Sequence, residues 1–132
     1  MSIAHGVNVR HVDNQSSRQM YVEFIDGEMV TCSELSNGMV HRTITLSRGN
    51  LDIDDKVKLP PSVSHDVALD KPVCHVCAQH TPMTVEYSYQ HSNGQDQVVM
   101  CSYVKQPSKK REVLALNIRS LVNHHNPYDL PC

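Results

Sequence analysis

The sequence predicts a mainly β protein, built from antiparallel hairpins in a sandwich- or barrel-like arrangement, with one C-terminal helix and a zinc knuckle. Two turn signals flanked by β-branched and aromatic residues indicate the hairpins, at Asp26-Gly27 and Asn93-Gly94. A C-x-x-C pair, Cys74 and Cys77, indicates the knuckle. With 132 residues, 39% of them hydrophobic, the chain is expected to form a single compact domain over residues 1–132.

The first hairpin is expected to join residues 20–25 to residues 28–35 through the Asp26-Gly27 turn. Pairing Ile25 with Glu28 places alternate residues of both strands on one mostly apolar face. The expected core face consists of Met20, Val22 and Phe24 beside Met29 and Thr31. A second turn at Asn37-Gly38 then predicts that residues 39–46, which are rich in β-branched side chains, continue the meander.

The middle of the chain is expected to connect two halves of the domain. Apolar residues alternate with polar ones before Pro60-Pro61, which predicts one more short strand that ends at the prolines. Residues 60–72 are Pro- and Ser-bearing and predict an internal connector loop. We find no internal repeat in the sequence.

The second hairpin has the best-defined register in the sequence. A turn centred on Asn93-Gly94 gives four pairs with apolar members, Tyr89 with Val98, Tyr87 with Met100, Val85 with Ser102 and Met83 with Val104. This face is the expected core face, which leaves Cys101 and Tyr103 on a half-solvated side.

Residues 109–122 are open to two interpretations. Ser108 is a suitable N-cap for a helix whose apolar stripe contains Leu114, Ile118, Leu121 and Val122, and this helix is the preferred prediction. The cations at residues 109–111 disfavour a helix N-terminus, and residues 113–118 are equally compatible with a strand.

Cysteine and histidine side chains cluster after the connector, where Cys74, Cys77 and His80 follow one another at intervals of three residues. Thiolates and neutral imidazoles are the ligands that zinc prefers, so one structural zinc ion is the expected cofactor. Cys101 is the preferred fourth ligand. The open alternatives are His75, His124, His125 and Cys132. Inert buried thiols and a redox pair are the alternatives to a metal site.

A basic cluster precedes the expected helix. It comprises Lys105, Lys109, Lys110 and Arg111, with Tyr103 beside it. Cations that contact phosphates, with an aromatic ring that stacks on unpaired bases, would make this segment a nucleic-acid-binding site. The net charge of -2 argues against non-specific coating of nucleic acid, because such binding needs many cations.

The sequence favours a non-enzymatic, zinc-stabilised interaction domain that binds an unknown protein partner through a sheet edge or the C-terminal helix. The alternatives are a zinc-dependent nucleic-acid binder that uses residues 105–111 and a metal-dependent hydrolase. A hydrolase is the less favoured class, because only Glu86 lies near the cluster as a candidate general base. Neither a targeting segment nor a membrane-spanning apolar stretch is evident, so a cytoplasmic or nuclear location is expected.

Overall fold

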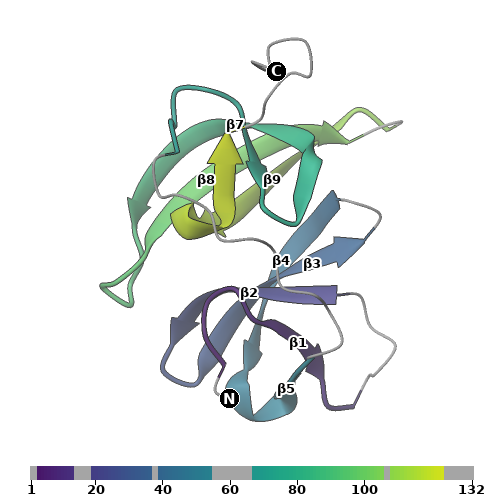
Figure 1. Ribbon diagram of the computed structural model, residues 1–132, viewed down its shortest axis with the longest axis vertical. Coiled ribbons are helices and arrows are strands. Elements are labelled where there is room, and N and C mark those ends of the chain that lie inside the picture. Colours follow the sequence, from purple (N-terminus) through teal and green to yellow (C-terminus); the bar gives the residue numbers. More distant parts are fainter. Residues whose placement is uncertain (1–2, 14–18, 37–38, 55–66, 106–107, 124–132) are drawn as a thin grey trace, which may run out of the picture.

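A computed structural model describes residues 3–13, 19–36, 39–54, 67–105 and 108–123, and its strands form two five-stranded antiparallel sheets. One sheet comes from each half of the chain, and the two halves lie one above the other along the long axis of the molecule (Figure 1). The predicted mainly β, antiparallel class is therefore confirmed.

The first sheet has the strand order β4-β3-β2-β1-β5. Its elements are β1 (Asn8–His11), β2 (Gln19–Asp26), β3 (Met29–Ser36), β4 (Met39–Ser47), the 3-10 turn η1 (Arg48–Asn50) and β5 (Leu51–Ile53). The second sheet has the order β10-β6-β7-β8-β9. Its elements are β6 (Val73–His75), β7 (Ala78–Gln90), β8 (Gln97–Lys105), β9 (Lys110–Asn117), the 3-10 turn η2 (Ile118–Ser120) and β10 (Leu121–Asn123).

Each sheet must curl strongly, because its two edge strands are consecutive in the chain. Strands β4 and β5 lie at opposite edges of the first sheet, and η1 alone separates them. In a flat sheet these edges would be about 19 Å apart, whereas the four Cα-to-Cα steps from Ser47 to Leu51 reach about 14 Å at most. Strands β9 and β10 likewise lie at opposite edges of the second sheet and are separated only by η2. Both sheets are therefore curved in the manner of a barrel.

The two halves repeat one another in topology, register and sequence. Segments 20–24 (Met-Tyr-Val-Glu-Phe) and 83–87 (Met-Thr-Val-Glu-Tyr) occupy equivalent places in β2 and β7, and each carries a bulge at its glutamate. Their partners are segments 30–33 (Val-Thr-Cys-Ser) and 99–102 (Val-Met-Cys-Ser). The prediction of no internal repeat is therefore wrong.

Equivalent residues of the repeat also build the hydrophobic cores. In the first half, Met20, Val22, Cys32 and Leu51 are buried together. The core of the second half contains their counterparts Met83, Cys101 and Leu121, with Val85 packed against it. This second core also takes in Tyr21, Leu35 and Val40 from the first half, so the two halves share part of their interior.

The first hairpin differs in register from its prediction. Asp26 pairs with Met29 and Ile25 with Val30, because the positive φ of 60° lies at Gly27 and the turn is one residue later than expected. The bulge at Glu23 then shifts the pairing again. Met20, Val22 and Phe24 of the expected core face are buried as predicted, whereas Met29 is 47% exposed. The alternate residues Tyr21, Glu23, Val30 and Cys32, outside the expected core face, are buried as well.

The second hairpin follows its predicted register only near the turn. Tyr89 pairs with Val98 and Tyr87 with Met100 as expected, but the bulge at Glu86 brings Val85 opposite Cys101. One extra residue reverses the side to which the following side chains point. The predicted core face therefore carries exposed tyrosines, and the predicted half-solvated face, Val99, Cys101 and Tyr103, lies in the core.

The predicted helix over residues 109–122 is wrong, since these residues contain β9, η2 and β10. Leu114 and Leu116 are buried while Val113 is exposed, which is the two-residue period of a strand. Lys109 has a positive φ of 59° in the turn between β8 and β9, so the cations mark the end of a hairpin. No α-helix occurs anywhere in the described ranges.

The repeat predicts that equivalent core positions contribute similarly to stability. Met20→Ala and Met83→Ala should each lower the free energy of unfolding by about 2–4 kcal/mol, because both side chains are buried in a packed core. Urea denaturation followed by circular dichroism measures both values. A negligible effect for either variant would contradict equivalent packing.

Candidate functional site

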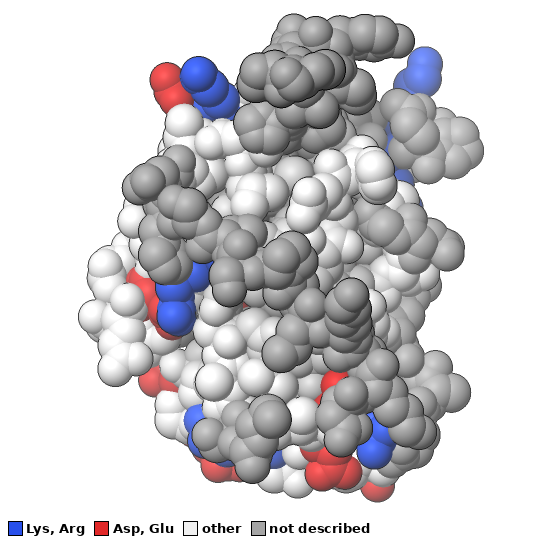
Figure 2. All heavy atoms as spheres, viewed as in Figure 1, with Lys and Arg blue, Asp and Glu red and all other residues white. Residues whose placement is uncertain are grey.

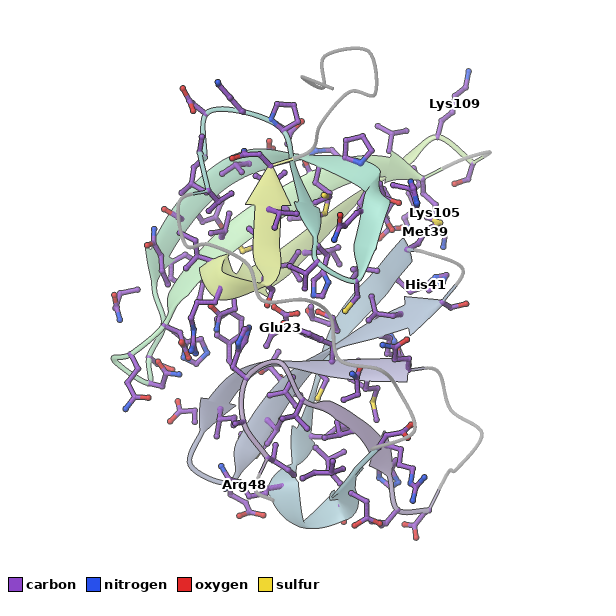
Figure 3. The ribbon with its side chains drawn as sticks, viewed as in Figure 1. Glu23, Met39, His41, Arg48, Lys105 and Lys109 are labelled. Carbon is purple, nitrogen blue, oxygen red and sulfur yellow. The ribbon has the colours of Figure 1, made fainter. Side chains whose placement is uncertain are left out.

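A buried carboxylate joins the two halves. The side chain of Glu23, at the bulge of β2, is fully buried and lies between the two sheets (Figure 3). His75 Nε2, on β6, lies 2.7 Å from Glu23 Oε2, and Ser33 Oγ donates to the same oxygen at 2.9 Å. The backbone N–H of Asn117, at the end of β9, donates to Oε1 at 2.9 Å. Glu23 therefore satisfies its lone pairs with donors from both halves.

Aromatic rings and hydroxyls extend this network toward the N-terminal segment. The Tyr21 ring packs edge-on against His75 at 4.6 Å and against His5 at 5.6 Å between ring centroids. His5 Nε2 and Ser120 Oγ are hydrogen-bonded at 2.8 Å. The Nδ1 atom of His75 accepts from the Cys77 N–H at 3.0 Å, which fixes the ring plane. Because Glu23, His75 and Ser120 are all buried, this network serves to position the halves.

The pKa of Glu23 lies below its ordinary value. Burial alone would raise this pKa, but the His75 ring and the hydrogen bonds from His75, Asn117 and Ser120 lower it by more. The carboxylate form is thus the one that the folded protein stabilises. A depressed folded-state pKa contributes stability above the unfolded value, and that contribution disappears as the pH falls through the folded-state value.

Removing this charge should loosen the junction between the halves. We expect Glu23→Gln to lower the free energy of unfolding at pH 7 by about 3 kcal/mol, because it breaks a buried, hydrogen-bonded pair. The difference from wild type should shrink below the ordinary pKa of glutamate.

The matched control is Glu86→Gln at the equivalent bulge, where the carboxylate is exposed and pairs with Arg111. That substitution should cost less than about 1 kcal/mol. Equal losses for the two variants in denaturant titrations across pH would contradict the assigned role of Glu23.

A loop of the second half covers the outer side of the first sheet. The His91 ring stacks on Phe24 at a centroid distance of 4.5 Å and an interplanar angle of 14°. In the same loop, Asn93 Nδ2 donates to the Ile25 carbonyl at 3.0 Å, and Ser92 Oγ donates to Asp26 Oδ2 at 2.9 Å. This loop is a second contact between the halves, separate from the Glu23 network. It buries Phe24 and adds two hydrogen bonds between the halves.

The equivalent side of the second sheet is open. Tyr87, the counterpart of Phe24, is 59% exposed, and it stacks on Tyr89 at a centroid distance of 6.1 Å. Strand pairing places Met100, Val104 and Val113 on the same side of the sheet, and Val104 and Val113 are about half exposed. We call these five residues the open face. Exposed aromatic and aliphatic side chains in one patch are typical of an interaction surface.

The predicted zinc ligands are placed apart from a common centre. Cys74 lies in β6, Cys77 is in the tight turn between β6 and β7, and His80 is an exposed residue of β7. Cys101 is fully buried in the core of the second half, where burial raises the pKa of its thiol to about 12. Burial likewise raises the pKa of Cys77 to about 11.

Within the described parts of the chain, no three His, Cys, Asp or Glu side chains gather to hold a metal ion. The alternative ligands His124, His125 and Cys132 lie outside the described residues. His75 is engaged by Glu23 and Cys77. The zinc site thus remains a prediction from the sequence.

This geometry predicts that the fold survives metal removal. Purified protein treated with a chelator should keep its melting temperature, because the described thiols lie in packed or hydrogen-bonded surroundings. Differential scanning calorimetry with parallel elemental analysis measures this. One equivalent of zinc, with a lower melting temperature after chelation, would restore the predicted metal site.

The predicted nucleic-acid residues are only partly available. Tyr103 is buried and its hydroxyl donates to the Val40 carbonyl at 2.9 Å. Arg111 pairs with Glu86, whereas Lys109, in the turn between β8 and β9, and Lys110, the first residue of β9, are exposed. Lys105 is half-buried. The exposed rings of this half are instead Tyr87 and Tyr89, which the sequence-based register had assigned to the core.

Within its described residues, the protein contains no helix that is long and apolar enough to cross a membrane. In comparisons with known proteins, the chain matches no family model, no curated protein and no solved structure.

Proposed function

We propose that the protein is a non-enzymatic interaction module whose open face binds a protein partner. The observation that carries this proposal is the contrast between the two repeats. The position of Phe24 in the first half is covered by the loop over residues 91–96, whereas Tyr87 at the same position in the second half is exposed. Tyr and Met side chains are common at the centres of protein interfaces.

The proposal shifts the binding surface from the predicted sheet edge or helix to a sheet side. Strand β8 pairs with a neighbour on both sides, whereas β7 beyond Met83 pairs with β8 alone, so the side chains of the open face supply most of the contacts. The buried junction supports this use, because it holds both halves rigidly behind the surface. Neither a zinc ion nor a catalytic residue takes part in this proposal.

Charge favours an acidic partner. Basic residues outnumber acidic ones among the described residues of the second half, and the reverse holds for the first half. On the face drawn in Figure 2, acidic side chains gather at the lower end of the molecule, which is the first half. Lys109, in the β8–β9 turn, and Lys110, at the start of β9, lie at the end of the open face where Val104 pairs with Arg111. Complementary charge at such a rim speeds association and selects partners.

A single-stranded nucleic acid is the second candidate ligand. The observation in its favour is that the stacked rings of Tyr87 and Tyr89 lie on the same sheet as the exposed lysines of the β8–β9 turn. Stacking and phosphate contact together are sufficient for weak binding of single strands. The aliphatic residues Val104 and Val113 make the open face less suited to this ligand than to a protein.

The proposal predicts that binders depend on the open face. Peptides selected from a displayed random library against the full chain should lose at least about 90% of their binding to a Tyr87→Ser, Val113→Thr double variant. Both residues are exposed, so the fold should persist, as circular dichroism would verify. The matched control is Met29→Thr, an exposed apolar residue of the first half.

Binders that respond equally to both variants would refute the open face as the interaction surface. Binding of oligothymidylate that weakens steeply with salt and is lost in Lys109→Glu, Lys110→Glu would instead support the nucleic-acid candidate.

A further inference from the structure

We propose, resting on the function proposed above, that the open face receives a tight turn of a partner protein. That turn presents a histidine or aromatic ring to Tyr87 and an Asn or Gln side chain to the β7 backbone, with acidic residues beside it. The structure contains a complete example of this mode of docking, built from the chain's own loop.

The internal example defines the contacts. Phe24 receives the flat His91 ring, and the carbonyl of the next residue, Ile25, accepts from the Asn93 amide. The loop is preorganised for this, since Asn93 Oδ1 accepts from the backbone N–H groups of Gln95 and Asp96, at 2.9 and 3.1 Å. A rigid turn loses little conformational entropy on docking, which favours turns over extended peptides as ligands.

The second half contains residues equivalent to Phe24 and Ile25. The bulges at Glu23 and Glu86 make Phe24 and Tyr87 equivalent, and they turn both rings away from their own core. The residue after Tyr87 is Ser88, whose carbonyl is the counterpart of the Ile25 carbonyl. The open face therefore offers the same pair of features, a ring and the carbonyl of the next residue.

The open face is also continuous with the interface between the halves. Val98 and Asn117 pair across β8 and β9, and both are buried. They lie two residues along these strands from the pair Met100 and Ala115, and therefore on the same side of the sheet. The Asn117 side chain donates to the Glu23 carbonyl of the first half at 2.7 Å. The side of the sheet that contacts the first half thus extends without interruption into the open face, which indicates that a second polypeptide can add to the same surface.

One difference between the repeats specifies the charge of the partner. Asp26 accepts from Ser92 in the covered site, but its counterpart in the second half is Tyr89, with no carboxylate. Lys109, in the β8–β9 turn, and Lys110, at the start of β9, lie at the other end of β8, beyond Val104 and several residues from Val98, the partner of Tyr89. Acidic residues of the partner outside the docked turn therefore fit this face better than basic ones.

Two other segments of the chain do not match this turn in sequence. The β2–β3 turn consists of Gly27 and Glu28 and carries no ring. The C-terminal residues His124, Asn126 and Asp129 have the spacing of His91, Asn93 and Asp96, but Pro127 stands where Gly94 has a φ of 73°. Proline cannot adopt that conformation. We therefore infer that the partner is a different protein.

The test is a titration of the isotope-labelled full chain, followed by amide chemical shifts, with a cyclic peptide that contains His-Ser-Asn-Gly-Gln-Asp flanked by two glutamates. We expect shifts confined to the open face, at Tyr87, Tyr89 and Val113. The affinity should fall about fivefold or more when the peptide's histidine is replaced by alanine, and equally in a Tyr87→Ser protein. The control protein, Met29→Thr, should bind as wild type does.

Other outcomes overturn the inference in distinguishable ways. Absence of shifts up to millimolar peptide, or equal binding of the alanine peptide, would refute turn docking. If displayed peptides still depended on Tyr87 and Val113, the proposed function would stand without it. Shifts of the same amides with oligothymidylate alone would assign the face to nucleic acid. A dimer in sedimentation that Tyr87→Ser abolishes would assign it to a second copy.

Discussion

The buried carboxylate of Glu23 is the constraint on which the arrangement of the two halves depends. An ionised group without solvent must be surrounded by donors, and here these come from β3, from β6 and from the end of β9. Any displacement of one sheet relative to the other would leave that charge without partners. The junction is therefore fixed by directional hydrogen bonds as well as by the apolar residues that the two halves share.

The two repeats use one bulge position in opposite ways. At Glu23 the bulge places the carboxylate in the interior, and at Glu86 it leaves the carboxylate exposed beside Arg111. In both repeats the ring of the next residue, Phe24 or Tyr87, points away from the core of its own half. The two rings differ in what covers them. The long β7–β8 loop packs over Phe24, whereas the short β2–β3 turn has no ring that could pack over Tyr87.

The local signals in the sequence predicted the hairpins well and their faces poorly. Asp26-Gly27 and Asn93-Gly94 locate two hairpin turns, because positive φ is a property of one or two residues. The bulges at Glu23 and Glu86 depend on tertiary packing, and each reverses the faces of a strand, so Tyr87 was assigned to the core. The contact between Glu23 and His75 spans 52 residues and has no local signature. The repeat is visible as Met-x-Val-Glu, but loops of unequal length separate its parts.

The extra length of the β7–β8 loop has a consequence for stoichiometry. A duplicated chain starts with two copies of every surface, and a symmetrical protein of this kind would be bivalent. Here the loop over residues 91–96 acts as a tethered ligand for one copy, at an effective concentration that no free molecule can match. With that copy covered, the proposed binding site is present once, so we expect the protein to bind one partner at a time and not to cross-link two.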